Sequence, residues 1–137
     1  MWWIYALLSA FFAALTAIFA KIGIKGVDTD LATAIRTTVV LVLAWVIAFV
    51  RGGTNSIGVL TKNNLLFLVL SGAATGLSWI FYFKALQLGK VSQVAPVDKL
   101  SVALAIIFSV AFLGETLTLK TAFGAVCIIG GTIIIIL

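Results

Sequence analysis

Five long apolar runs constrain this chain more than any other feature of its sequence. They cover about residues 3–22, 31–50, 64–87, 92–113 and 120–137. Each is close to the roughly 20 residues that an α-helix needs to cross the hydrocarbon core of a bilayer. Because lipid offers no partner to backbone groups, such runs fold as helices, and they lack the alternation of a β-barrel. The sequence predicts one all-α polytopic membrane domain over residues 1–137 with five transmembrane helices.

The composition indicates that lipid is the main solvent. Hydrophobic residues make up 64% of the chain and charged residues only 9%, whereas about 25% of a soluble domain is charged. The formal net charge is +5, from nine Lys and Arg against four Asp and Glu. The basic residues are scattered singly, mostly at the ends of apolar runs. This pattern is typical of membrane-flanking charge and argues against a nucleic-acid partner.

Several function classes are disfavoured. The chain has one cysteine, Cys127, and no histidine, so Cys/His zinc sites and His-based catalysis are excluded within one chain. We expect no cofactor, no metal and no enzymatic activity. A channel would need rings of one charge or a repeated filter, and neither occurs. The first run has no basic segment before it and exceeds a signal-peptide core, so we expect it to be retained.

The joints between the runs are short and carry turn or capping residues. Residues 26–30 hold turn and N-cap residues before the second run, and residues 51–63 form the one long polar loop. Other boundary residues are Gly89 after the third run, Ser92 as a cap for the fourth, Gly114 at its end, and Thr118 before the fifth. These residue types favour helix ends.

The only proline, Pro96, stands two residues before adjacent opposite charges, Asp98 and Lys99. If the fourth helix starts near Ser92, Pro96 lies at or just beyond its first turn, where the missing N–H costs little; deeper, it would kink the helix. Asp98 and Lys99 then lie roughly 10 Å inside the helix. Adjacent side chains point about 100° apart, so each needs another partner. We expect Arg36 to serve Asp98 and a substrate anion to serve Lys99.

Other polar residues within the spans need an explanation, because a charge near the bilayer centre costs about 2.5–3.5 kcal/mol. Arg36 and Lys84 either snorkel to the headgroups or face a partner or cavity. Trp79 and Tyr82 either pack or line a cavity. The candidate cavity residues are Arg36, Ser78, Trp79, Tyr82, Lys84, Gln93, Asp98 and Lys99. Lysines and arginine at span ends, namely Lys21, Lys25, Arg51, Lys62, Lys90 and Lys120, are interpreted as interfacial anchors.

Small residues recur at helical spacing in the first, third and fifth spans. Such faces let helices approach closely in lipid. We expect them to pack inside the five-helix bundle; the alternative is dimer contact through the fifth or the first helix. The candidate packing or hinge residues are Gly72, Gly76, Gly89, Pro96, Gly124 and Gly131.

The segment from Tyr82 to Glu115, "YFKALQLGKVSQVAPVDKLSVALAIIFSVAFLGE", resembles the helix three to helix four signature of EamA-type proteins in the drug/metabolite transporter superfamily. The shared elements are Tyr82, Ala85-Leu86, Gly89, Val94-Ala95-Pro96 and the closing Phe112-Leu113-Gly114-Glu115. The fifth run, "GAVCIIGGTIII", also fits the family's glycine-bearing last span. The resemblance covers the chain and is most specific over residues 82–131.

The resemblance implies a fold and a function. Members contain a five-helix unit, usually present twice as inverted halves of a ten-helix transporter, and move amino acids, drugs, nucleotide sugars and other small metabolites. A single unit is expected to form a dimer around a midplane cavity, with an identical chain or a paralogous half. The implied location is a prokaryotic inner or plasma membrane, with lipid and a small-molecule substrate as the other partners.

The distribution of charge favours an outside N-terminus and a cytoplasmic C-terminus. Loop charges alone divide evenly between the two faces, which also fits insertion in both orientations and an antiparallel homodimer; a parallel dimer or a heteromer is the alternative. The expected mechanism is alternating access by a secondary transporter. The alternative function is a non-transporting membrane subunit of a larger complex.

Overall fold

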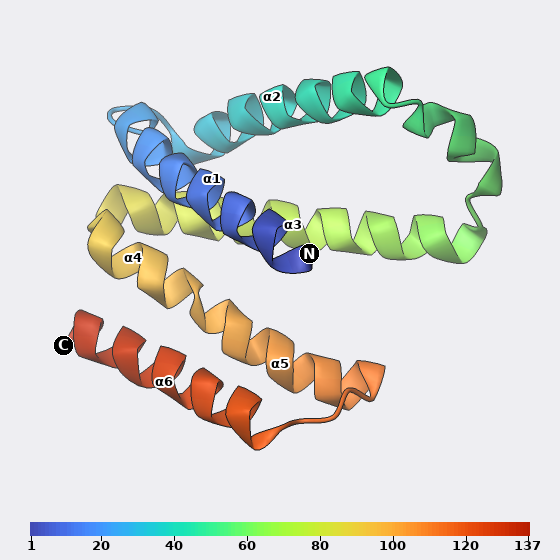
Figure 1. Cartoon of the computed structure of the whole chain (residues 1–137). Coiled ribbons are helices and arrows are strands. Elements are labelled where there is room, and N and C mark those ends of the chain that lie inside the picture. The colour runs from blue at the N-terminus through green and yellow to red at the C-terminus, as the bar shows by residue number, and fades with distance from the viewer. The chain divides into compact units, whose positions relative to one another are not determined.

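The computed structural model describes residues 1–137, and all of its regular secondary structure is helical. The elements are α1 Trp2–Gly23, α2 Thr29–Val50, the 3₁₀ helix η1 Gly53–Val59, α3 Lys62–Leu88, α4 Val91–Asp98, α5 Leu100–Leu113 and α6 Leu119–Ile136 (Figure 1). Five segments are long and apolar enough to cross a membrane, with α4 and α5 together forming the fourth. The predicted all-α polytopic fold is confirmed.

Capping side chains fix the starts of two helices. The Asp28 carboxylate accepts hydrogen bonds from the backbone N–H groups of Asp30 and Leu31, both at 3.0 Å. The Thr118 hydroxyl accepts one from the N–H of Thr121 at 3.2 Å. These bonds satisfy donors that the first turn of a helix leaves without intrahelical partners. The predicted turn before α2 and the predicted cap of α6 are both present.

A left-handed glycine ends α5, as its sequence predicts. Gly114 has φ of 68°, a conformation that glycine adopts without steric cost. The next N–H, of Glu115, donates to the carbonyl of Ser109 at 3.3 Å. The Gly114 N–H bonds to the same carbonyl, so these two bonds close the end of the helix.

The polar loop is more ordered than the sequence predicts. The 3₁₀ helix η1 occupies most of it. The Thr61 hydroxyl then accepts a hydrogen bond from the N–H of Asn64 at 3.2 Å, and α3 begins at Lys62, two residues before the predicted start. A capping hydroxyl therefore extends α3 backwards into the loop.

The fourth span differs from the prediction at its start and in its middle. It begins at Val91 with Lys90 as the N-cap, so Ser92 is not the cap. Pro96 is therefore in the second turn, and the first-turn interpretation is wrong. Its ring removes one helical N–H and crowds the preceding turn. The helix is interrupted at Lys99, whose N–H bonds to the carbonyls of Ala95 at 3.3 Å and Pro96 at 3.0 Å.

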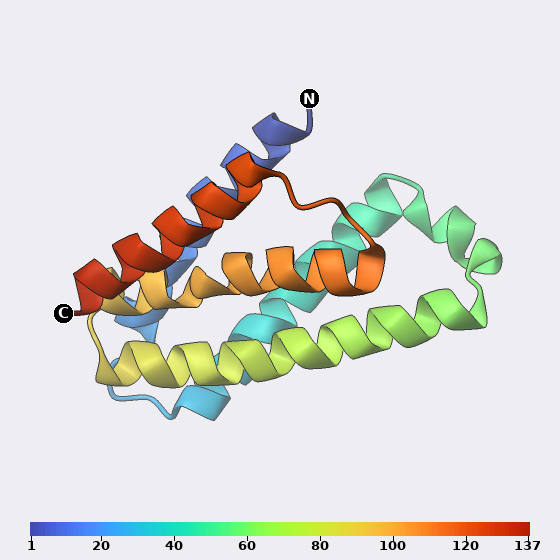
Figure 2. The same ribbon diagram turned by 90° about the horizontal axis from the view of Figure 1, so that it is seen from below.

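The chain divides into two compact units. We call Met1–Ile18 with Leu88–Leu137 the terminal unit, and Phe19–Gln87 the central unit. In the terminal unit, α6 runs alongside α5 and α4 (Figure 2). In the central unit, the residues buried near the end of α1, the start of α2 and the end of α3 are Ala20, Ile24, Thr29, Thr33, Phe83 and Leu86.

Most apolar side chains of the spans are exposed on the isolated chain. Leu119 and Phe112, for example, retain 91% and 80% of their accessible surface. In water this would be costly, but lipid tails are as apolar as these side chains. Helix association therefore depends on close packing and on hydrogen bonds.

Candidate functional site

One face of α2 carries polar residues into the membrane. Thr29, Thr33 and Arg36 follow each other at steps of four and three residues, which places them on one side of the helix. The two threonines are buried and Arg36 is half-buried. The Thr33 hydroxyl donates to the Thr29 carbonyl at 2.7 Å, so it needs no other partner. Arg36 lies roughly 10 Å along the helix from Thr29.

Two aromatic rings of α3 hold the Arg36 guanidinium. Its central carbon lies 4.0 Å from the centroid of the Trp79 ring and 5.4 Å from that of Phe83. Trp79 and Phe83 are four residues apart, which puts both rings on the same face of α3. Phe83 is 2% exposed, so its ring is fixed by packing. The cation therefore occupies a defined position.

The magnitude of these contacts explains why a cation is tolerated there. A cation over an aromatic face is stabilised by about 2 kcal/mol or more once water is removed. That is close to the roughly 2.5–3.5 kcal/mol cost of placing Arg in a span. Stacking of Arg36 on Trp79 thus offsets much of the insertion cost. The predicted explanations for Arg36 were snorkelling, a salt bridge or a cavity-facing cation, and none of them included stacking on aromatic rings.

The stacked guanidinium keeps its hydrogen-bonding edge available. A guanidinium has five N–H donors, and the Arg36 side chain makes its contacts in the chain through the ring faces rather than through a hydrogen bond. Carboxylate and phosphate groups bind to this edge through two parallel charge-assisted hydrogen bonds. The arrangement can therefore recognise an anionic group.

The structure brings together only some of the predicted residues of the central unit. Tyr82 is half-buried and lies one turn after Trp79, on the same side of α3. Ser78 and Lys84 are exposed, and their spacing from Trp79 places them off that side. Sequence reasoning missed Phe83. Its four-residue spacing from Trp79 was the available signal, but an apolar ring in an apolar helix does not stand out.

The Asp98 and Lys99 side chains pair with each other, contrary to the prediction. The Lys99 Nζ lies 3.5 Å from the Asp98 Oδ2, and both side chains are well exposed on the chain. The predicted angle of about 100° between neighbouring side chains assumed a continuous helix. The turn at Lys99 interrupts that helix, and the long lysine stem reaches back to the carboxylate. Gln93, one turn before Pro96, is exposed.

A hydroxyl from α6 lies against the interrupted helix. Thr132 is 4% exposed, and its Oγ1 lies 2.8 Å from the Ile128 carbonyl and 3.3 Å from the Pro96 carbonyl. A hydroxyl has only one proton to donate, so it donates mainly to the nearer acceptor, the Ile128 carbonyl within α6. Thr132 nonetheless places a hydroxyl beside the Pro96 carbonyl, close to the point where the helix is interrupted. This contact could not be predicted from the sequence, because it depends on how α6 packs against α4.

The glycine faces are open on this chain. A Cβ atom built on Gly72, Gly76, Gly124 or Gly131 would meet no atom within 4 Å. On α6, the half-buried Ala125 and the buried Thr132 each follow one of these glycines, so they lie about 100° around the helix from Gly124 and Gly131. The packing of these glycines inside the bundle stays a prediction.

Five apolar spans define a multi-pass membrane protein, and the cation held on aromatic rings within one of them is its candidate functional site. The chain matches the EamA-like transporter family over residues 1–137 and belongs to it. The resemblance drawn from the sequence is confirmed.

A curated relative from Sinorhizobium sp, described as "Uncharacterized transporter in cobO 3'region", is 46% identical over 134 residues. The alignment covers 98% of this chain and 95% of the relative. No solved structure matches the chain. The family and the relative point to a membrane transporter rather than an enzyme.

Proposed function

We propose that this protein is a secondary transporter of small molecules bearing a carboxylate or phosphate group, and that it works as a dimer of five-helix chains. The observation that carries the substrate class is the Arg36 guanidinium, stacked at 4.0 Å on Trp79 with its donor edge unused inside the chain. A cation fixed in this way attracts an anion without a competing internal carboxylate. Among the charges within the spans, Arg36, Lys84 and Lys99 also outnumber Asp98.

The proposed mechanism is alternating access, with one chain moving against the other around a central substrate site. Transporters of this kind are commonly built from two related halves, and this chain supplies one set of five spans. The interruption between α4 and α5 gives one span a place to bend. The open glycine faces offer surfaces along which a second chain can approach closely.

The decisive test of function is transport by the purified protein in liposomes. The substrate panel contains carboxylates, phosphate esters, neutral and acidic amino acids, and cationic drugs. We expect uptake or counterflow of an anionic member, and loss of that transport in the Arg36→Gln variant. Transport restricted to cationic drugs would contradict the proposed substrate class while leaving the transporter assignment intact.

The dimer has a direct test in the native cysteine. Cys127 is exposed and lies at the middle of α6, three residues after Gly124 and four before Gly131, so the three share one face. If two chains meet along this face, their Cys127 residues come close in a parallel and in an antiparallel arrangement alike. Oxidation in membranes should then produce a cross-linked dimer, since a disulfide needs Cα atoms about 4.4–6.8 Å apart.

Two variants sharpen the dimer test. Gly131→Leu should reduce cross-linking by blocking close approach, whereas Ala125→Leu, on the side that faces the rest of the chain, should act by destabilising the fold. Absence of any Cys127 cross-link in membranes would contradict a dimer through this face of α6. Measuring the molecular mass in detergent micelles then shows whether another face joins the chains.

The alternative function, a non-transporting membrane subunit, is favoured by one observation. Asp98 and Lys99 satisfy each other within the chain, as expected of charges with a purely structural role. Transport of any substrate by the purified protein alone would exclude this alternative. Absence of transport, together with stable association with a second membrane protein, would support it.

A further inference from the structure

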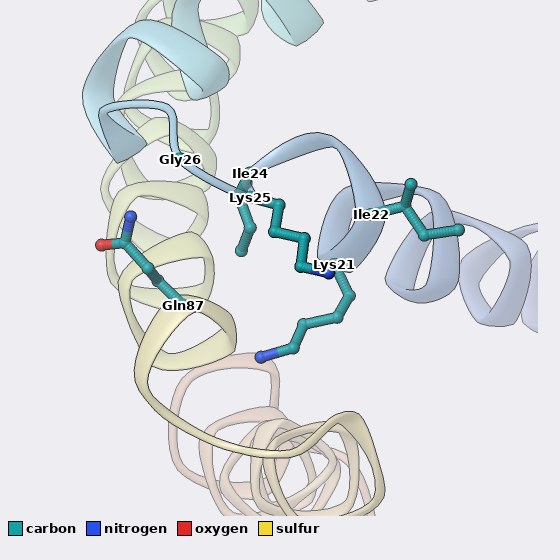
Figure 3. Close-up of a pocket in the computed structure, with 6 residues that line it drawn as sticks. All are labelled: Lys21, Ile22, Ile24, Lys25, Gly26 and Gln87. Atoms are coloured by element: carbon teal, nitrogen blue, oxygen red, sulfur yellow. The ribbon is translucent and has the colours of Figure 1, made fainter.

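A pocket of about 510 Å³ lies at one end of the central unit (Figure 3). It is lined by Lys21, Ile22, Ile24, Lys25, Gly26 and Gln87. These residues come from the last turn of α1, the connection to α2, and the last turn of α3. The volume is within the roughly 300–1,000 Å³ range of small-molecule sites.

Two hydrogen bonds hold the walls of this pocket together. The Gln87 side-chain Nε2 donates to the Val27 carbonyl at 3.1 Å, and the Lys21 Nζ donates to the Leu86 carbonyl. The first bond ties the connection after α1 to the end of α3, and the second ties the last turn of α1 to it, across 60 and 65 residues of sequence. Gly26 has φ of 74°, which turns the chain toward α2. The pocket is thus built by specific contacts rather than by a loose loop.

The pocket is positively charged. Lys21 and Lys25 are four residues apart, and in Figure 3 the Lys21 side chain points toward the turn after α3 while the Lys25 side chain runs back toward the last turn of α1. No carboxylate lines it. Asp28, a nearby acid in the sequence, has its Oδ1 occupied by two backbone N–H groups at the start of α2. Lys25 is exposed and its ammonium makes no hydrogen bond or ion pair within the chain.

The position of the pocket indicates what it binds. It lies where two membrane spans end, at Gly23 and Leu88, which is the depth of the lipid headgroups. Its apolar lining continues toward the span at Ile22, which is 68% exposed, and Ile24 is buried beneath it. A ligand with a phosphate at headgroup depth and an apolar part directed along the span matches this arrangement.

We propose that this pocket binds the phosphate group of an anionic membrane lipid, with Lys21 and Lys25 contacting the phosphate. Basic pockets between spans on the cytoplasmic side are suited to such headgroups, and clustered lysines are attracted to anionic leaflets. The orientation that the charge distribution favours places this end of the spans in the cytoplasmic leaflet. The site differs from the Arg36 site in residues and in depth along the spans, and does not depend on the substrate proposed above.

The test is a lipid titration of the full chain in detergent, followed by native mass spectrometry. Phosphatidylglycerol is compared with the zwitterionic phosphatidylcholine. We expect phosphatidylglycerol to bind more tightly, and Lys25→Gln to weaken its binding about fivefold, the effect of removing one lysine near an anionic headgroup. Lys25 makes no internal contact, so this variant should fold. Lys25→Arg, which keeps the charge, should restore the affinity.

The matched control is Lys62→Gln at the opposite end of α3. It removes the same charge without touching the pocket, and should leave the affinity unchanged. Equal weakening by Lys62→Gln, or equal binding of phosphatidylcholine and phosphatidylglycerol, would overturn the proposal. In a last experiment, inorganic phosphate is added to the protein in lipid-free detergent, and the thermal stability of the protein is measured. Stabilisation by phosphate that Lys25→Gln abolishes, without preferential phosphatidylglycerol binding, would assign the pocket to a soluble anion and overturn the lipid assignment.

Discussion

Arg36 and the Asp98–Lys99 pair are both charged sites within apolar spans, and the chain accommodates them differently. Arg36 is half-buried against two aromatic rings of another helix. Asp98 and Lys99 lie at an interruption of their own helix and neutralise each other at 3.5 Å. The first arrangement needs tertiary structure, whereas the second is local.

The difference separates a site that can bind from one that is internally satisfied. Aromatic faces stabilise the Arg36 charge without using its hydrogen-bond donors, so the cation remains able to bind an anion. An ion pair cancels both charges and leaves little net attraction for a substrate. We therefore expect Arg36 to dominate substrate binding, with Asp98 and Lys99 contributing less.

Replacing Arg36 should have the largest effect. A hydrogen bond to a charged group is worth about 1.5–3 kcal/mol, so Arg36→Gln should lower kcat/KM for an anionic substrate roughly 10- to 100-fold. Arg36→Lys should restore little of this activity, because an ammonium lacks the planar edge with which a guanidinium forms two parallel hydrogen bonds. The measurement is uptake into proteoliposomes, with Lys120→Gln, in the first turn of α6, as a control distant in sequence from Arg36. Unchanged uptake in Arg36→Gln would contradict the dominant role of Arg36 in substrate binding and would favour the Asp98–Lys99 pair.

Replacing Trp79 tests the aromatic support. Trp79→Leu should lower the free energy of unfolding by about 1–2 kcal/mol, since it removes the ring beneath the cation. Trp79→Phe should cost less because a smaller aromatic face remains. Denaturant titration in micelles gives these values. If combining Trp79→Leu with Arg36→Gln costs as much as the sum of the two single changes, the two residues are not coupled and the stacking has no energetic role.

Replacing Asp98 should have a smaller effect on stability. Exposed ion pairs contribute at most about 1 kcal/mol, so Asp98→Asn should change expression and unfolding little. Transport should fall more than expression, because Lys99 is then an uncompensated cation. The pair is tested by a double-mutant cycle with Lys99→Gln, for which we expect a coupling below about 1 kcal/mol. A larger coupling would show that the pair is buried in the working protein.

Replacing Thr132 should have the smallest effect. Thr132→Val keeps the shape and removes the hydroxyl beside the Pro96 carbonyl, and hydrogen bonds between membrane helices average about 0.6 kcal/mol. Thr121→Val, at the exposed start of α6, is a matched control. Thermal denaturation in micelles measures both. A loss above about 2 kcal/mol would show that the Pro96 carbonyl depends on this hydroxyl more than the two distances imply.

Much of the fold follows from local sequence signals. Apolar runs of about bilayer length predict the spans, and Thr118 and Gly114 mark helix ends because caps act over one turn. The interruption at Lys99 was harder to predict. It depends on where α4 begins, and moving the start from Ser92 to Val91 carried Pro96 into the second turn.

The candidate site was only partly predictable for a physical reason. Arg36 and Trp79 stand out individually, because charge and indole N–H are costly in lipid. That they stack on each other, and that Phe83 joins them, depends on the relative rotation of two helices. Sequence spacing fixes which residues share a face of one helix, but not which faces meet. The same reasoning applies to Thr132 and to the lysine pocket.

The contact between Thr132 and the carbonyl of Pro96 has a mechanical consequence. A helix interrupted in its middle behaves as two rigid rods joined by a pivot, and here the pivot is attached sideways to α6. Any change in the angle between α4 and α5 therefore pulls on α6. In a dimer joined along the face of α6 that carries Gly124 and Gly131, that pull would be transmitted to the second chain, so that bending of one chain would shift the other.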